Sequence, residues 1–112
     1  MCPFCEIVGH RMGANVVLED DDVMAFHDIS PQAPVHVLVV PKRHLESLRH
    51  AAPADEALLG KLLLAAQRAA GRLGLFGDGF RVVINSGPKA GQSVMHLHVH
   101  LLGGRPMAWP PG

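Results

Sequence analysis

Three histidines alternate with apolar residues in the segment Met95-His96-Leu97-His98-Val99-His100-Leu101-Leu102. Alternation with a period of two is typical of a strand that is buried on one side, so the segment predicts imidazoles on one face, roughly 6–7 Å apart. Each imidazole has two ring nitrogens that need partners, which makes such a row a poor choice for packing alone. The row could bind a metal ion, attack a substrate as a nucleophile, or face the solvent.

The segment Gly87–Ser93, directly upstream, contains glycines, a lysine and a serine. A turn of this composition can present backbone N–H groups and a hydroxyl to an anion. A phosphate held there would lie against the imidazoles, and an imidazole can attack phosphorus to form a covalent phosphohistidine. The combination favours phosphoryl chemistry on the histidine segment.

Cys2 and Cys5 form a Cys-x-x-Cys pair close to the N-terminus. A thioredoxin-like redox pair usually follows a strand, and only Met1 stands before Cys2. The pair could instead supply half of a zinc site, or consist of two reduced thiols that pack as small apolar side chains.

One amphipathic helix and several short strands must position these residues. The helix is predicted from Pro53 to Arg72, where apolar residues recur at spacings of three and four. A short helical turn is predicted at Phe4–Val8, ended by Gly9. The strands are predicted at Val16–Leu18, Val23–Phe26, Val35–Val40, Phe80–Asn85 and in the histidine segment. This order of elements predicts an α+β fold with an antiparallel sheet of about five strands.

Composition excludes several classes of protein. The chain has 112 residues, of which 48% are hydrophobic, so we expect residues 1–112 to form a single domain with a real core. Ten basic and ten acidic residues cancel without a basic stripe, which argues against a nucleic-acid polymer but not against a single nucleotide. There is no signal peptide and no apolar run that could span a membrane, so we expect a cytoplasmic protein without membrane contact.

The histidine segment resembles the signature of the histidine triad (HIT) family of nucleotide hydrolases and transferases, in which three histidines alternate with apolar residues. Other stretches are similar to the Hint branch of that family, and the likeness extends over nearly the whole chain. They are Phe26-His27-Asp28-Ile29-Ser30-Pro31-Gln32-Ala33-Pro34, Val39-Val40-Pro41-Lys42, Gly91-Gln92-Ser93-Val94 and Trp109-Pro110-Pro111-Gly112. The resemblance implies a HIT-like fold and a set of catalytic roles.

In those roles His98 is the nucleophile that takes the α-phosphorus of a nucleotide, and His100 hydrogen-bonds the phosphate or the leaving group. The resemblance assigns His96 and His36 to the proton network that keeps His98 in the right tautomer. Ser93 would reach the leaving group.

The resemblance also implies a nucleotide site. Asp28 would accept hydrogen bonds from both ribose hydroxyls, although it could instead only cap its own proline-rich turn. The side chains that would shape the base slot are Phe4, Ile7, Phe26, His27, Ile29 and Leu38, each of which could also be plain core. The phosphate would be held by Asn85 and the backbone of Gly91, Gln92 and Val94. Trp109 would approach the substrate of a partner subunit.

A structural zinc site is implied as well, with Cys2, Cys5, His44 and His96 as ligands. Such a closed Cys2His2 site has no water to activate, so catalysis would need no metal. It would also remove His96 from proton transfer, and whether His96 is a ligand or a proton relay stays open.

The activity implied first is cleavage of P–N bonds in conjugates of AMP or GMP with amines. A dinucleoside polyphosphate hydrolase and a non-catalytic nucleotide-binding module are the alternatives. The resemblance further implies a homodimer that pairs the long helix and the strand after Asn85, so that the sheet extends across a twofold axis.

Overall fold

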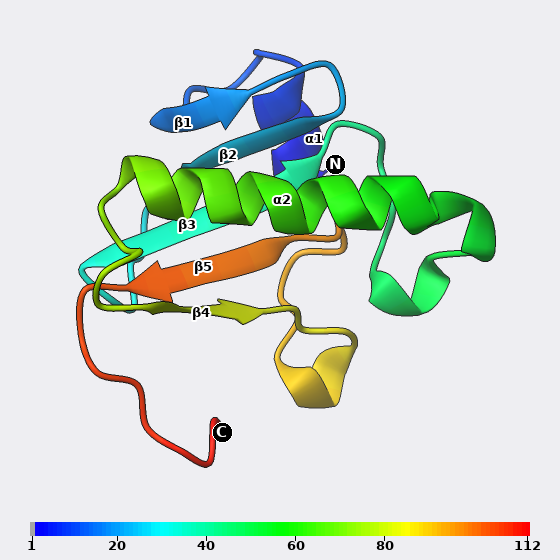
Figure 1. The fold of residues 1–112 in the computed structure, drawn as a ribbon. Helices are drawn as coiled ribbons and strands as arrows, with labels where there is room; N and C mark the ends of the chain where they lie inside the picture. The colour runs from blue at the N-terminus through cyan, green and yellow to red at the C-terminus, as the bar shows by residue number, and fades with distance from the viewer. Residues whose placement is uncertain (1) are drawn as a thin grey trace.

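A five-stranded antiparallel sheet forms the centre of the computed structural model, which describes residues 2–112. The strands follow the order β1-β2-β3-β5-β4. Their bounds are β1 Val16–Glu19, β2 Val23–His27, β3 Val35–Pro41, β4 Phe80–Val83 and β5 Val99–Gly103. The helix α2 (Glu56–Arg72) lies across one face of the sheet, and the short helix α1 (Pro3–Val8) lies behind the sheet, on its other face (Figure 1). The predicted α+β class is confirmed.

The alternation of side chains along the strands separates two apolar layers. On the α2 side, Val37, Val39, Val99 and Leu101 are fully buried and belong to one core with Leu62 of the helix. On the α1 side, a smaller core is made of Phe4, Met24, Phe26, Leu38 and Val40. The functional side chains share this second face, because each strand turns every other residue toward it.

The helix α2 begins three residues later than the sequence predicts. Pro53–Asp55 form a tight 3-10 turn, closed by the Asp55 carboxylate, which accepts a hydrogen bond of 2.8 Å from the N–H of Ala52. The helix then ends at Arg72, as predicted. Within residues 2–112, no helix combines the length and the apolar character needed to cross a bilayer.

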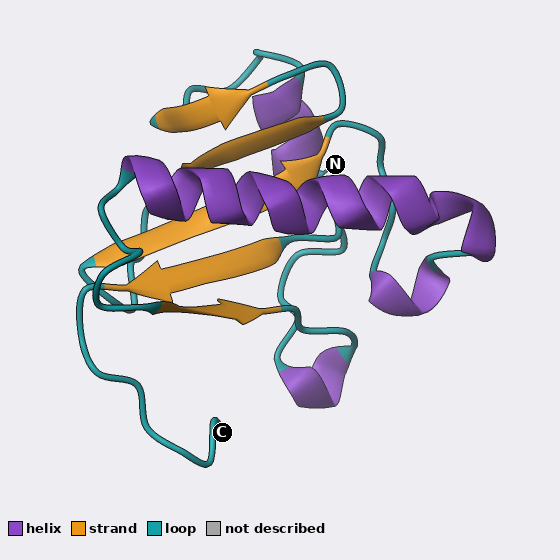
Figure 2. Cartoon of the chain, in the orientation of Figure 1, coloured by secondary structure: helices purple, strands orange, loops and turns teal. Residues whose placement is uncertain are grey.

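Two strand predictions were too long. The histidine strand was expected from Met95, but β5 begins at Val99, where it pairs with Val39. Before that point the chain leaves the ladder, because the N–H of Leu97 donates to Leu45 O at 2.6 Å and Pro41 has no N–H to offer. Short helical turns and loops fill the connections around this end of the sheet (Figure 2).

The strand β4 was expected to reach Asn85 but ends at Val83. Its last pair joins Val83 to His100, one residue from the start of β5 at Val99. Because β4 is an edge strand and β5 is its one neighbour, β4 ends close to the residue at which β5 begins.

Candidate functional site

A cavity of about 440 Å³ opens between α1 and the sheet. It brings together most of the residues that the sequence predicts for catalysis and nucleotide binding. These are Phe4, Ile7, Phe26, His27, Asp28, Ile29, Leu38, Ser93, Val94, His98 and His100. The cavity is therefore the candidate functional site.

The floor of the cavity runs across adjacent strands of the sheet. Phe26, Leu38 and His100 lie opposite one another on three adjacent strands and form a row across its floor. Beyond Phe26 the wall is the segment Met12–Ala14, next to Asn15, whose carbonyl accepts a hydrogen bond of 2.9 Å from the N–H of His27. From His100 to the wall at Met12–Ala14 there are three strand spacings, or roughly 14 Å, which is enough for a mononucleotide laid across the strands.

His98 is held in one tautomer. Its Nδ1 lies 2.7 Å from the carbonyl oxygen of His96, and because a carbonyl can only accept, Nδ1 must carry the proton. The unprotonated nitrogen of the neutral ring is then Nε2. The ring is buried and packs edge-on against Phe4, with ring centroids 5.1 Å apart. His98 thus offers a free lone pair on a side chain that lines the cavity.

His36 and His100 form a second ordered pair. The N–H of Gln32 donates to Nδ1 of His36 at 3.0 Å, so the proton of His36 is on Nε2. That Nε2–H donates to Nδ1 of His100 at 2.9 Å, which places the proton of His100 on its own Nε2. Within the described part of the chain, this buried Nε2 of His100 has no hydrogen-bond partner. It is a donor available to a ligand in the cavity.

Both rings of this pair are neutral near neutral pH. Burial first, and then the neighbouring His98 and His36, together lower the pKa of His100 to about 4, against the opposing effect of Asp28. Burial also lowers the pKa of His36, against the opposing effect of the Asp28 carboxylate. Neutral rings agree with the tautomers above, because each nitrogen then has a single role.

Asp28 has one oxygen engaged and lone pairs to spare. Its Oδ1 accepts a hydrogen bond of 2.8 Å from the N–H of Ser30, which is the turn-capping role weighed for this residue. Its Oδ2 lies 3.4 Å from Nε2 of His36. A carboxylate has about four acceptor sites, so capping does not prevent Asp28 from meeting hydroxyl groups in the cavity.

The turn before the histidine segment is organised from inside by Gln92. Its buried side chain accepts from the N–H of Gly87 at 3.0 Å and donates to the carbonyls of Glu46 at 2.7 Å and Val94 at 3.0 Å. The backbone N–H groups of Gly91 and Gln92 donate to Pro88 O and Gly87 O, both at 3.1 Å. These two amides are thus used within the turn, whereas Ser93 and Val94 line the cavity.

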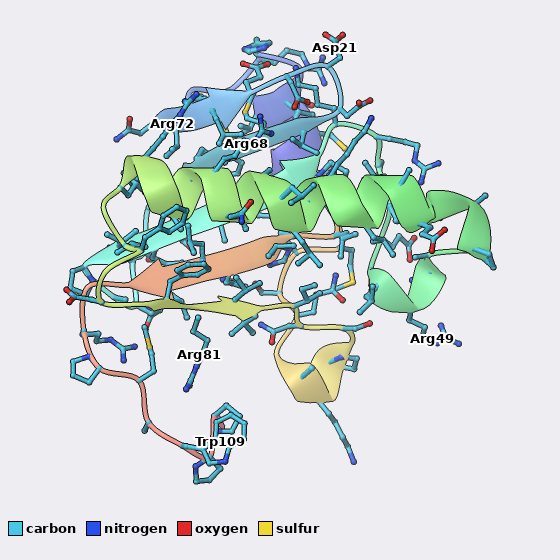
Figure 3. The ribbon with its side chains drawn as sticks, viewed as in Figure 1. Asp21, Arg49, Arg68, Arg72, Arg81 and Trp109 are labelled. Carbon is cyan, nitrogen blue, oxygen red and sulfur yellow. The ribbon has the colours of Figure 1, made fainter. Side chains whose placement is uncertain are left out.

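Four residues expected at the nucleotide do not line the cavity of this chain: Asn85, Gly91, Gln92 and Trp109. Trp109 is 81% exposed in the C-terminal tail beyond β4, where Arg81 lies over its ring at 5.9 Å (Figure 3). Asn85 follows the end of β4, beside the strand that continues from His98.

The sequence analysis missed five lining residues: Pro3, Met12, Gly13, Ala14 and Ser30. Pro3 and Ser30 adjoin predicted residues, so their neighbours could have suggested them. Met12–Ala14 belongs to an irregular segment without periodicity, and only its position beside β2 brings it to the cavity.

A second cluster lies at the N-terminal end of α1. The ligand atoms of Cys2, Cys5, His44 and His96 all lie within 4.8 Å of one another. The Sγ atom of Cys2 is 3.3 Å from Nδ1 of His96, and Sγ of Cys5 is 3.2 Å from Nδ1 of His44 and 3.5 Å from Nδ1 of His96. The two histidine nitrogens are 3.2 Å apart. Zinc bonds of about 2.3 Å to sulfur and 2.0–2.1 Å to nitrogen give tetrahedron edges of roughly 3.3–3.8 Å, so the four residues could hold such an ion.

The hydrogen bonds of His96 suit the same role. Its Nε2 donates to Pro41 O at 2.8 Å, which leaves the lone pair on Nδ1, the atom that faces the cysteines. Burial raises the pKa of the Cys5 thiol, and the neighbouring Cys2 raises it further. A bound cation is the kind of charge that would favour thiolates here.

Known proteins resemble this chain over nearly its whole length. A family model described as the HIT domain matches residues 10–107. The chain is 55% identical over 109 residues to an uncharacterized HIT-like protein of Synechocystis, covering 97% of this chain and 95% of the relative. It is 50% identical over 111 residues to the adenylylsulfatase HINT1 of Arabidopsis thaliana, covering 97% of this chain and 75% of the relative. A HIT family hydrolase from Legionella pneumophila superposes with a TM-score of 0.98 at 45% identity over 100% of both chains. A histidine triad protein from Clostridium difficile gives 0.93 at 38% identity, over 96% and 93%.

Proposed function

Because this chain belongs to the HIT family, we propose that it hydrolyses the P–N bond of purine nucleoside 5′-monophosphoramidates, which are conjugates of AMP or GMP with an amine or a lysine side chain. The observation that carries the proposal is the pairing of two groups at one end of the cavity. His98 presents an unprotonated Nε2, and His100 presents an N–H without a partner among the described residues. A nucleophile beside a fixed donor suits attack on a phosphorus that bears negative oxygens.

One orientation of the nucleotide suits the residues that line the cavity. We place the phosphate at His98, in the cavity that Ser93 and Val94 also line, and the ribose over Asp28. The base then reaches the apolar end, between Ile7 and the wall at Met12–Ala14. Asp28 accepts from the ribose hydroxyls with the lone pairs that Ser30 leaves free.

The reaction runs in two displacements. The lone pair on Nε2 of His98 attacks the phosphorus, and the P–N bond breaks with its electron pair passing to the amine, which takes a proton from solvent. The carbonyl of His96 steadies the positive charge on the nucleotidyl-imidazole through Nδ1–H. Water then attacks the same phosphorus and gives one proton to solvent, and the P–Nε2 bond breaks with its electron pair returning to His98, which releases the nucleoside monophosphate. The N–H of His100 holds a phosphate oxygen throughout, so the donor needs no reorganisation.

The proposal includes a structural zinc ion held by Cys2, Cys5, His44 and His96. With four protein ligands such an ion binds no water, so it supplies rigidity and no step of the reaction. His96 is then a ligand and not a proton relay, in line with the lone pair of Nδ1 facing the cysteines.

The proposal also includes a homodimer. Its support is the exposed edge of β4, where Phe80 is 39% exposed, and the 81% exposed Trp109 of the tail that follows β5. Sedimentation velocity at micromolar concentration would give the mass of two chains. A single species with the mass of one chain would rule the dimer out.

A second candidate is hydrolysis of an adenylyl sulfate, since a relative with 50% identity is named an adenylylsulfatase. Attack by His98 on the phosphorus would be the same, and sulfate would leave in place of the amine. The difference between the two candidates therefore lies in the leaving group.

Steady-state rates on adenosine 5′-phosphoramidate, adenylyl sulfate and a diadenosine polyphosphate separate these activities. We expect the highest kcat/KM on the phosphoramidate. His98→Gln should lower kcat by about 10³-fold or more, because the nucleophile is lost. The matched control is His50→Gln, which changes another histidine, one that is exposed and outside the cavity. Full turnover in His98→Gln would refute the mechanism, and tight AMP binding without turnover of any substrate would favour a binding module.

A further inference from the structure

His96 connects the cysteine cluster to the nucleophile. Its side chain gives Nδ1 to the cluster and Nε2–H to the carbonyl of Pro41, while its own carbonyl accepts the Nδ1–H of His98. The residue is fully buried. Any rotation of the peptide that carries His96 therefore changes the hydrogen bond that sets the tautomer of His98.

The helix α1 connects the same cluster to the wall of the cavity. Cys2 is the N-cap of this helix, and its Sγ accepts a hydrogen bond of 3.3 Å from the N–H of Cys5. One turn of the same helix presents Phe4 and Ile7 to the cavity. Phe4 also packs against His96 and His98, with ring centroids 5.9 and 5.1 Å away.

The apolar packing of α1 is small. The helix has six residues, of which Phe4 is buried and Ile7 and Val8 are only partly buried against the same core. Helices of this length are unstable unless tertiary contacts hold them. The cluster supplies such a contact, because it joins Cys2 and Cys5 of this segment to His44 after β3 and His96 before β5.

We propose that metal occupancy of the Cys2, Cys5, His44 and His96 cluster positions both His98 and the α1 wall, and thereby sets the nucleotide affinity of the cavity. His96 is in this sense a positioning residue that acts through His98. The inference rests on the proposed zinc site and nucleophile. It goes beyond a stabilising zinc ion, which would raise the melting temperature without changing the cavity of the folded protein.

The primary test compares zinc-loaded and chelator-treated protein at a temperature at which circular dichroism shows both to be folded. Metal content is measured first, and then AMP affinity is measured by titration calorimetry. We expect AMP binding to weaken about tenfold without zinc, equivalent to about 1.4 kcal/mol, and to recover with one equivalent of zinc. Unchanged affinity, or purified protein without a stoichiometric metal and without zinc uptake, overturns the inference.

A second readout follows the nucleophile directly. Nitrogen-15 NMR of the histidine rings distinguishes the Nδ1–H and Nε2–H tautomers of His98. Removing zinc should lower the Nδ1–H fraction as the bond to His96 loosens. A fraction that does not respond to zinc contradicts the positioning role.

The variant His44→Gln removes a cluster ligand that does not line the cavity, and His50→Gln is its matched control. His44→Gln should bind AMP like the zinc-free protein, and His50→Gln should bind like the wild type. If His44→Gln does not fold, the chelated wild type decides. If AMP affinity depends on zinc but the protein does not turn over phosphoramidates, the proposed activity is rejected and this inference stands. If turnover and AMP binding are both independent of zinc, the proposed activity stands and this inference is rejected.

Discussion

The Nε2 atom of His36 lies 2.9 Å from Nδ1 of His100 and donates its proton there, because the N–H of Gln32 occupies the other nitrogen of His36. This one contact fixes the proton of His100 on the side away from His36, where the buried Nε2–H has no partner among residues 2–112. A donor chain that starts from a backbone amide thus ends as a free N–H at the candidate site.

Replacing His100 by alanine should remove this donor. We expect kcat on a phosphoramidate to fall by about 10²–10³-fold, the usual cost of losing a fixed donor to a developing charge. AMP affinity should change less than kcat, because the interaction strengthens in the transition state. The measurement is steady-state kinetics beside AMP titration, with His50→Gln as control. An equal loss in both would instead indicate general damage to the cavity.

The variant Asp28→Asn should weaken discrimination between ribose and deoxyribose. The amide oxygen can still accept from the N–H of Ser30, but the second carboxylate oxygen is replaced by a donor. We expect the ratio of kcat/KM for ribo- over deoxyribo-substrates to fall about 10- to 150-fold, in line with one lost charge-assisted hydrogen bond of about 1.5–3 kcal/mol. An unchanged ratio would confine Asp28 to capping its turn.

The variant Gln92→Ala should destabilise the protein and also lower kcat. Three buried hydrogen bonds are lost, to Gly87, Glu46 and Val94, and we expect a cost of about 2–4 kcal/mol in the free energy of unfolding. We expect the loosened turn also to displace Ser93, which lines the cavity. Gln67→Ala, on the exposed side of α2, is the control and should change stability by less than about 0.5 kcal/mol. Equal stability of the two variants in urea would contradict this account of the turn.

Acid should destabilise the folded chain through the buried histidine pair. The pKa of His100 is lowered from 6.5 to about 4, and the pKa of His36 is also lowered. Burial is the largest cause for both side chains. Between these values the unfolded chain binds protons that the folded chain does not, so stability falls as pH decreases from about 6.5 toward about 4.

Urea unfolding of zinc-free protein at several pH values tests this, since zinc loss then makes no contribution. The urea concentration at the unfolding midpoint should decrease as the pH is lowered across that window. The decrease should be less steep in His100→Ala, which has one titrating group fewer. The same slope in both proteins would show that His100 does not contribute.

The amino-acid sequence by itself determined the fold class and the chemical groups. The short run of mostly β-branched apolar residues in Val35–Val40 and the apolar stripe of α2 are local features, so both could be recognised without the fold. The similarity of the histidine segment and of the loop around Asp28 to the HIT signature indicated the family. The bounds of β4 and β5 could not be read this way, because each strand ends where its neighbour ceases to pair.

Only the tertiary structure decided which nitrogen of each histidine carries the proton. The row divides because the partners that place the protons come from distant parts of the chain: Pro41 for His96, and Gln32 through His36 for His100. The wall at Met12–Ala14 likewise reaches the cavity only because Asn15 pairs with His27. A hydrogen bond fixes a tautomer only when both partners are in place, so the sequence supplied the imidazoles and the fold assigned their protons.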